Sequence, residues 1–129
     1  MRVYFAASLC AAMLALASAA ESLEGWERLG ARALDLRGER DTIEVGRNEG
    51  RFHSIMLDVD GSAIEMLNLH VIFGDGNAYA SPAPLTFDAS ERSRVIDLPG
   101  DTRIIRSITF NYRSLGAGGG RATITAYGR

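Results

Sequence analysis

The chain has 129 residues, of which 47% are apolar and 23% are charged, a composition that fits one globular domain and excludes a disordered or fibrous chain. Its formal net charge is −2, and every cationic side chain is an arginine, so no global positive field would hold it on nucleic acid. Nucleic acid is therefore not an expected partner.

The first twenty residues have the pattern of a secretory signal peptide. Arg2 precedes an apolar run that ends near Ala17, and small residues follow up to Ala20. We therefore expect residues 1–20 to be cleaved and residues 21–129 to form a single domain that is exported to the periplasm or outside the cell. The one cysteine, Cys10, lies in this leader, so the mature chain would hold no disulfide. No later apolar run approaches the roughly 18 residues needed to cross a bilayer, so the mature chain is expected to have no transmembrane segment.

After the leader, short stretches of β-branched and apolar residues alternate with Gly, Asp, Asn and Pro, without a helical period. This pattern predicts an all-β fold, an antiparallel two-sheet β-sandwich of about eight strands. Asp60-Gly61 and Asp75-Gly76 fit tight hairpin turns, because glycine accepts a positive φ, so we expect consecutive strands to pair as a meander. The expected strands are 26–36, 42–45, 52–59, 64–73, 78–85, 94–98, 103–113 and 121–127.

The last two expected strands show clear alternation between an apolar and a polar face. The segment from Gly116 to Gly120 would join them as a hairpin and bring Arg113 close to Arg121. Like charges that face each other across a ladder are unfavourable unless an anion lies between them. The candidate ligand contacts are therefore Arg113 and Arg121, with Asn111 and Tyr127 beside them, and the candidate ligands are phosphate, sulfate or a uronate. The expected apolar face carries Ile104, Ile108, Phe110, Tyr112, Ala122, Ile124 and Ala126.

Other polar residues favour structural roles. His53 and His70 are predicted to point to opposite sides of a sheet and so not to share a metal, and we expect neither a metal site nor another cofactor. Asp97 and Arg106 would lie on one face of neighbouring strands and form an ion pair. The mature chain would have no cysteine and no Gly-x-Ser-x-Gly motif, so nucleophilic catalysis is not expected.

A set of strand and turn segments stands out along the chain: Trp26 with Leu29-Gly30, Asp41 to Val45, Gly50 to Phe52, Val71 to Gly76, Ser93 to Gly100, Arg103 to Arg106, Arg121-Ala122 and Gly128-Arg129. Together they resemble a family of small exported bacterial proteins catalogued only as a domain of unknown function. The resemblance spans about Leu23 to Arg129. It implies an exported β-sandwich and implies no reaction, cofactor or catalytic residue.

The sequence thus predicts an exported module that is not an enzyme and that binds another envelope protein, either by adding a strand to an open sheet edge or by presenting a polar face. Two alternatives stay open. One is a binding module for anionic ligands or glycans that uses Arg113 and Arg121. The other is a hydrolase with dispersed carboxylates.

Overall fold

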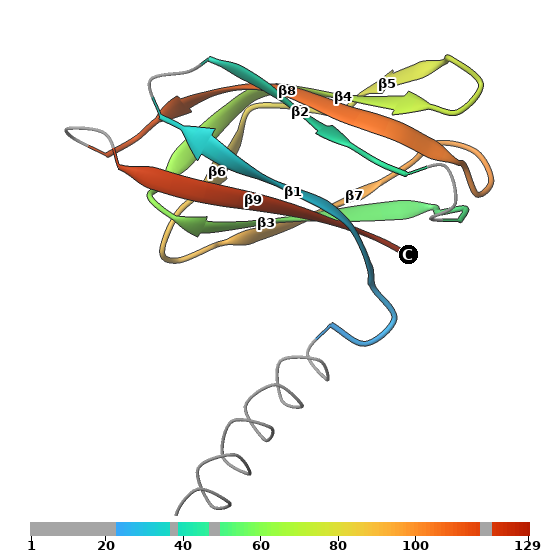
Figure 1. Ribbon diagram of the computed structural model, residues 1–129, viewed down its shortest axis with the longest axis horizontal. Coiled ribbons are helices and arrows are strands. Elements are labelled where there is room, and N and C mark those ends of the chain that lie inside the picture. The colour runs from blue at the N-terminus through green and yellow to red at the C-terminus, as the bar shows by residue number, and fades with distance from the viewer. Residues whose placement is uncertain (1–22, 37–38, 47–49, 117–119) are drawn as a thin grey trace, which may run out of the picture.

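The computed structural model describes residues 23–36, 39–46, 50–116 and 120–129. These residues form nine strands in two antiparallel sheets that pack face to face, which confirms the expected all-β sandwich (Figure 1). The predicted leader, residues 1–20, lies outside the described residues. No helix in the described part of the chain is long and apolar enough to span a membrane.

The two sheets are called sheet A and sheet B. Sheet A contains, in spatial order, β1 (Glu27–Asp35), β9 (Arg121–Gly128), β3 (Ser54–Gly61) and β7 (Ser93–Asp97). Sheet B contains β2 (Arg40–Glu44), β8 (Ile105–Ser114), β4 (Ile64–Phe73) and β5 (Ala78–Ala80), and β6 (Leu85–Phe87) also pairs with β4. The single strand expected over 78–85 is therefore two short strands, because prolines at 82 and 84 cannot donate to a ladder.

The expected meander is wrong, because most consecutive strands lie in different sheets. Of the nine strands in the described residues, only β4, β5 and β6 follow one another within one sheet, and each other pair of consecutive strands is divided between the two sheets. Asp75-Gly76 does form the tight β4–β5 turn, in which Phe73 N–H donates to the Asn77 carbonyl at 2.8 Å. Asp60-Gly61 instead ends β3 at a crossing, where Gly61 has φ +102°. A Cβ at Gly61 would lie 2.3 Å from the Arg121 carbonyl oxygen, so the close approach of β9 requires glycine.

The crossing connections also separate Asp97 from Arg106. Asp97 ends β7 in sheet A and accepts a hydrogen bond from the Ser54 hydroxyl at 2.8 Å. Arg106 lies in β8 of sheet B, and its guanidinium donates to the Gly74 carbonyl at 3.5 Å. The expected ion pair between them is wrong, because β7 and β8 lie in different sheets and are not neighbouring strands of one sheet.

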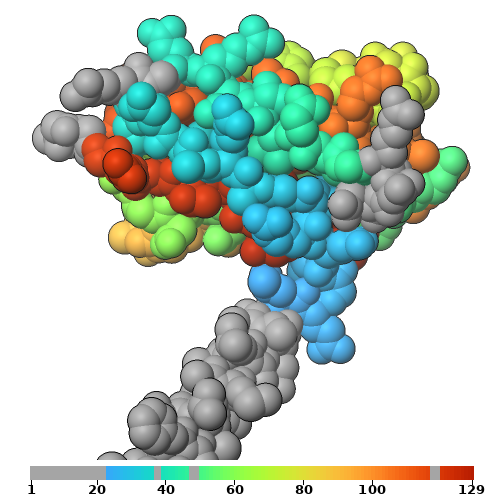
Figure 2. All heavy atoms as spheres, viewed as in Figure 1, coloured from blue at the N-terminus to red at the C-terminus, as the bar shows by residue number. Residues whose placement is uncertain are grey.

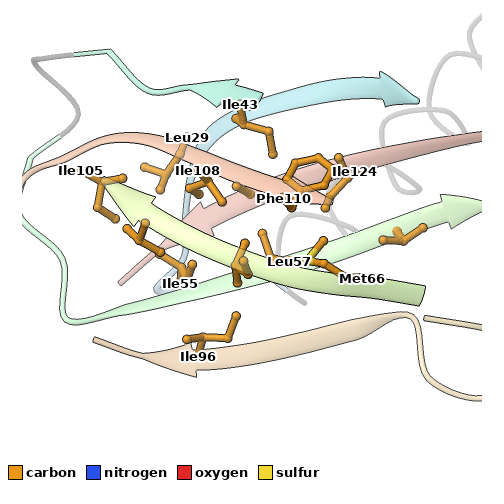
Figure 3. Packing of buried hydrophobic residues seen from close by; sticks show 14 of the residues in the cluster. Leu29, Ile43, Ile55, Leu57, Met66, Ile96, Ile105, Ile108, Phe110 and Ile124 are labelled. Atoms are coloured by element: carbon orange, nitrogen blue, oxygen red, sulfur yellow. The ribbon is translucent and has the colours of Figure 1, made fainter. Parts of the chain in front are cut away.

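The hydrophobic core fills the space between the sheets (Figure 3). Ile108, Phe110 and Ile124 are fully buried there, as the alternation of their strands predicts. Burial of each such side chain stabilises the fold by about 1.5–3 kcal/mol. Tyr112 is also buried, and its hydroxyl donates to the Asp35 carbonyl at 2.9 Å, which ties β8 of sheet B to β1 of sheet A.

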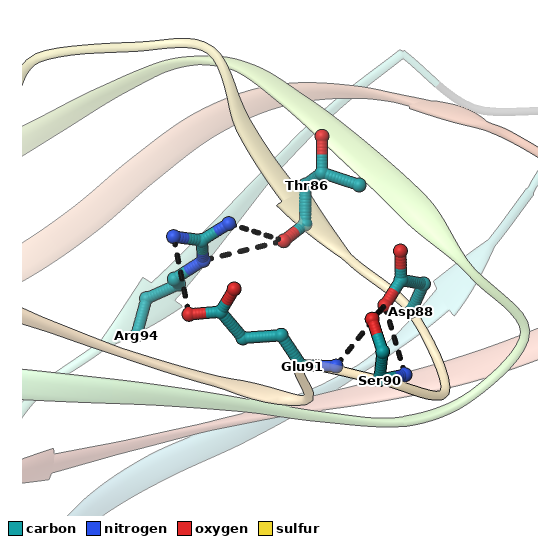
Figure 4. Close-up of polar contacts among 5 residues, drawn as sticks. All are labelled: Thr86, Asp88, Ser90, Glu91 and Arg94. Carbon is teal, nitrogen blue, oxygen red and sulfur yellow. Dashed lines mark hydrogen bonds and ion pairs between the residues drawn. The ribbon is translucent and has the colours of Figure 1, made fainter.

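Two sets of contacts close the sides of the sandwich. On the face shown in Figure 2, side chains of β1 and β2 lie side by side, and Arg32 Nε donates to Asp41 Oδ1 at 2.6 Å. On the side where the chain crosses from β6 to β7, the Arg94 guanidinium donates to the Thr86 carbonyl, with its closer nitrogen at 3.1 Å (Figure 4). The Asp88 carboxylate holds the turn between these strands by accepting from the Ser90 hydroxyl at 2.6 Å.

Candidate functional site

The structure does not bring together the four side chains expected to contact a ligand. Arg113 and Asn111 belong to β8 in sheet B, whereas Arg121 and Tyr127 belong to β9 in sheet A. The expected ladder between Arg113 and Arg121 is therefore wrong. Glu65 Oε1 accepts from Arg113 Nε at 2.7 Å, so β4 already supplies the counter-charge that an anion was expected to provide. A role of these four residues in ligand binding stays a prediction.

A cationic pocket lies at the other end of β8, where residues 103–106 lead into the strand. Its volume is about 490 Å³, which falls within the range of about 300–1,000 Å³ that is usual for small-molecule sites. Among the described residues, three guanidinium groups and one carboxylate give the lining a formal charge of +2, in a chain whose net charge is −2. The lining residues are Val45, Arg51, Phe73, Gly74, Asp75, Arg103, Ile104, Ile105 and Arg106.

Backbone hydrogen bonds join the separate segments that form this pocket. Phe52 and Arg103 exchange two such bonds, at 2.7 and 2.9 Å, which places Arg51 beside the segment that leads into β8. Gly74 N–H donates to the Ile104 carbonyl at 2.8 Å. The pocket is thus built on fixed backbone, and the end of β4 and the start of β8 are joined across it.

Arg103 is the most firmly held of the three arginines. Its guanidinium carbon lies 3.9 Å from the centroid of the Phe73 ring, a cation–π contact. Its Nη2 also donates to Asp75 Oδ2 at 3.2 Å. Only 26% of the Arg103 side chain is exposed, so one face of its guanidinium is covered while other donor groups remain available to the pocket.

Asp75 is the single carboxylate among the lining residues that the structure describes, and its hydrogen bonds keep it ionised. The backbone N–H of Asn77 donates to Oδ1 at 2.9 Å, and the Asn77 side-chain amide donates to Oδ2 at 3.1 Å. The pKa of Asp75 is lowered from its usual value chiefly by the backbone hydrogen bond from Asn77, and the positive charge of Arg103 lowers it further. The carboxylate therefore remains negative at neutral pH.

Arg106 reaches the pocket because of a β-bulge. Ser107 pairs with Ile72 and Ile105 pairs with Phe73, so Arg106 is an extra residue that faces no partner in β4. A bulge bends its strand and changes the direction in which a side chain points. The bulge also explains why Ile104 does not lie on the apolar face where it was expected. Ile105 is buried in its place, whereas Ile104 is 37% exposed and lines the pocket.

The sequence contained one sign of this bulge. Strict alternation fails at Arg103-Ile104-Ile105-Arg106, where two apolar residues stand together between two charged ones. Nothing in the sequence indicated that Arg51 would join them, since it lies about fifty residues earlier in the chain.

The two histidines lie on different sheets. His70 is an exposed residue of β4 in sheet B, and His53 is an exposed residue just before β3 in sheet A. Among the described residues, no group of three or more His, Cys, Asp or Glu side chains is placed to hold a metal ion.

Fold and pocket together define a small antiparallel β-sandwich with a cationic cavity at one end. The chain belongs to the family described as a domain of unknown function, DUF2541, whose model matches residues 7–128. The family resemblance seen in the sequence is thereby confirmed. No curated protein matches the chain.

Several solved structures resemble it at low sequence identity. The family 32 carbohydrate-binding module of C. perfringens NanJ, in complex with galactose, has a TM-score of 0.46 and 14% identity over 79% of this chain and 98% of its own. A mutant of a family 29 carbohydrate-binding module has a TM-score of 0.43 and 12% identity, with 82% of each chain covered. Pseudomonas aeruginosa AlgX has a TM-score of 0.46 and 15% identity over 82% of this chain, which spans 27% of the AlgX chain.

Proposed function

We propose that this protein is a non-catalytic binding module that holds an anionic ligand in the cationic pocket. The observation that supports this is the convergence of Arg51, Arg103 and Arg106 on one cavity, in which Asp75 is the one carboxylate among the described lining residues. Arginine presents donors in a fixed fork that matches the oxygen atoms of carboxylate, sulfate and phosphate groups. The pocket therefore offers an anion more than one guanidinium group in an otherwise acidic protein.

The arginines have different roles in this proposal. Arg103 is held by Phe73 and Asp75 and forms a fixed wall of the pocket. Arg51 and Arg106 are exposed, and an entering anion would order both side chains. If each contributes about 1 kcal/mol to ligand binding, the loss of both weakens binding about 30-fold.

The test is binding of sulfate, phosphate and a uronate at low ionic strength, measured by thermal shift and by calorimetry. At a ligand concentration ten times Kd, the expected stabilisation is about 1.4 kcal/mol, which raises Tm by about 5 °C for a domain of this size. The increase should shrink with added sodium chloride, because the arginines are exposed to solvent.

The matched variants are Arg51→Ala with Arg106→Ala, and Arg113→Ala with Arg121→Ala, since each pair removes two positive charges. At the same ligand concentration, we expect the first pair to reduce the ligand-induced rise in Tm to less than about 1 °C and the second pair to retain the full rise. The reverse result would assign binding to Arg113 and Arg121 instead. No response to any anion would contradict the proposal, and release of product from a glycan panel would contradict its non-catalytic part.

The site of action is part of the same proposal. If residues 1–20 are cleaved as a leader, the module acts in the periplasm or outside the cell. Mass measurement of the mature protein from a fractionated culture tests this. Binding to another envelope protein stays a separate prediction from the sequence.

A further inference from the structure

The carboxylate of Asp75 lies among positive charges, and it restricts which anions the pocket favours. Its side chain is 55% exposed at the cavity wall, beside the Arg103 guanidinium at 3.2 Å. A simple anion that enters is attracted by three arginines but repelled by Asp75. A pocket for a bare inorganic anion would gain affinity if this residue were neutral.

Asp75 has room for one further hydrogen bond. A carboxylate accepts at about four positions on its two oxygens. Among the described residues, Oδ2 receives donors from Asn77 and Arg103, whereas Oδ1 receives a single donor, the Asn77 backbone N–H. The described residues therefore leave an acceptor position of this pocket-lining carboxylate unused.

The remaining wall is apolar where a ring could rest. Ile104 is 37% exposed and lies between Arg103 and Arg106 in the chain, and Val45 adds a second aliphatic side chain. An anion without a carbon skeleton leaves this wall exposed to water. A ligand whose C–H groups cover Ile104 removes apolar surface from water.

We infer that the ligand of this pocket is a sugar acid, whose carboxylate binds Arg51 and Arg106 while a ring hydroxyl donates to Asp75 and the ring lies against Ile104. This inference rests on the proposed anion-binding function and specifies the chemical class of the anion. These residues can bind a ligand that carries a negative group and a hydroxyl donor on one small ring. A uronic acid has both groups.

The experiment uses calorimetry to compare the affinities of three probes: acetate, a neutral hexose and the corresponding hexuronate. Acetate has only the carboxylate, the hexose has only the ring and its hydroxyls, and the hexuronate has both. We expect the hexuronate to bind about tenfold more tightly than acetate, because a hydrogen bond to a charged acceptor adds roughly 1.4 kcal/mol. The neutral hexose should bind more weakly than either. Sulfate and phosphate are included as further anions without a sugar ring.

The decisive variant is Asp75→Asn. Its amide oxygen can still accept from the Asn77 N–H, so the β4–β5 turn is retained, and circular dichroism with Tm checks the fold. The variant should bind acetate and sulfate as well as or better than the parent, because a repulsive charge is gone, yet lose most of the preference for hexuronate over acetate. Asp60→Asn is the matched control, because Asp60 is an exposed acid near the C-terminal end of β3 and does not line the pocket. This variant should prefer hexuronate over acetate as strongly as the parent does.

The outcomes separate the two proposals. Anion binding that depends on Arg51 and Arg106 but shows equal affinity for hexuronate and acetate overturns the sugar-acid inference and leaves the binding function standing. An unchanged preference in Asp75→Asn also overturns it. Absence of binding by every anion overturns the proposed function itself.

Discussion

Replacement of Arg103 by alanine should destabilise the fold, whereas replacement of Arg106 should not. Arg103 covers one face of the buried Phe73 ring, with its guanidinium carbon 3.9 Å from the ring centroid. Arg106 is exposed, and among the described residues its side chain makes one long hydrogen bond, at 3.5 Å, to the Gly74 carbonyl. The two arginines line the same pocket, so the comparison separates stability from ligand binding.

The magnitude follows from the contacts of Arg103. A partly desolvated cation–π contact contributes about 1 kcal/mol. The aliphatic part of the side chain, which is mostly covered, contributes about 1 kcal/mol more through burial of its methylene groups. The exposed contact with Asp75 is screened by water and is left out. We therefore expect Arg103→Ala to cost about 2 kcal/mol, and Arg106→Ala less than about 0.5 kcal/mol.

Urea unfolding with linear extrapolation measures both values, and a loss of about 2 kcal/mol should lower Tm by roughly 8 °C or more. Arg103→Met is the informative control, because methionine restores an apolar chain against Phe73 without the charge. It should regain about half of the lost stability but not the affinity for an anion. Equal stabilities of Arg103→Ala and Arg106→Ala would refute the reasoning, because the stacked guanidinium would then contribute nothing to the fold.

Two further predictions concern contacts outside the pocket. Tyr112→Phe removes the hydroxyl that donates to Asp35 across the two sheets, so urea unfolding should show a loss of about 1 kcal/mol, and an unchanged midpoint would contradict this link. The pKa of Asp88 is lowered from its usual value of 3.8, chiefly by the hydrogen bond from the Ser90 hydroxyl and further by backbone N–H groups. Its contribution to stability is therefore fully present above pH 3.8 and is lost as the pH falls through the lower folded-state pKa. Asp88→Asn should flatten the decrease of the urea midpoint in this acidic range, and a decrease as steep as that of the parent would contradict the assignment.

The fold class was predictable because it depends on local patterns. Alternation in the strands around Phe110 and Ile124 identifies the faces that become buried, whichever strands they pair with. Glycine positions were also informative, since both Gly61 and Gly76 have positive φ. These features depend on a few neighbouring residues, so a single sequence contains them.

Strand pairing was not predictable in the same way. Alternation assigns a side chain to a face but does not say which strand lies beside it. The residues around Asp60-Gly61 fit a hairpin turn, yet β3 and β4 lie in different sheets and Gly61 packs against β9 instead. The same ambiguity made Arg113 and Arg121 appear to be neighbours, whereas Arg113 faces Glu65 and Arg121 faces Asp35.

The one sign of the candidate site in the sequence is the break in strand alternation at residues 103–106. In a regular strand, the residues after Arg103 would alternate, and Arg106 would share a face with the core residue Ile108. The insertion of one residue at the bulge lets Ile105 enter the core and leaves both flanking arginines at the pocket. A regular β8 would bury Arg106 or expose Ile105, and each alternative costs free energy without a compensating contact. The bulge is therefore what allows two cations only three positions apart to line one cavity, and Arg51 joins them because Phe52 pairs with Arg103.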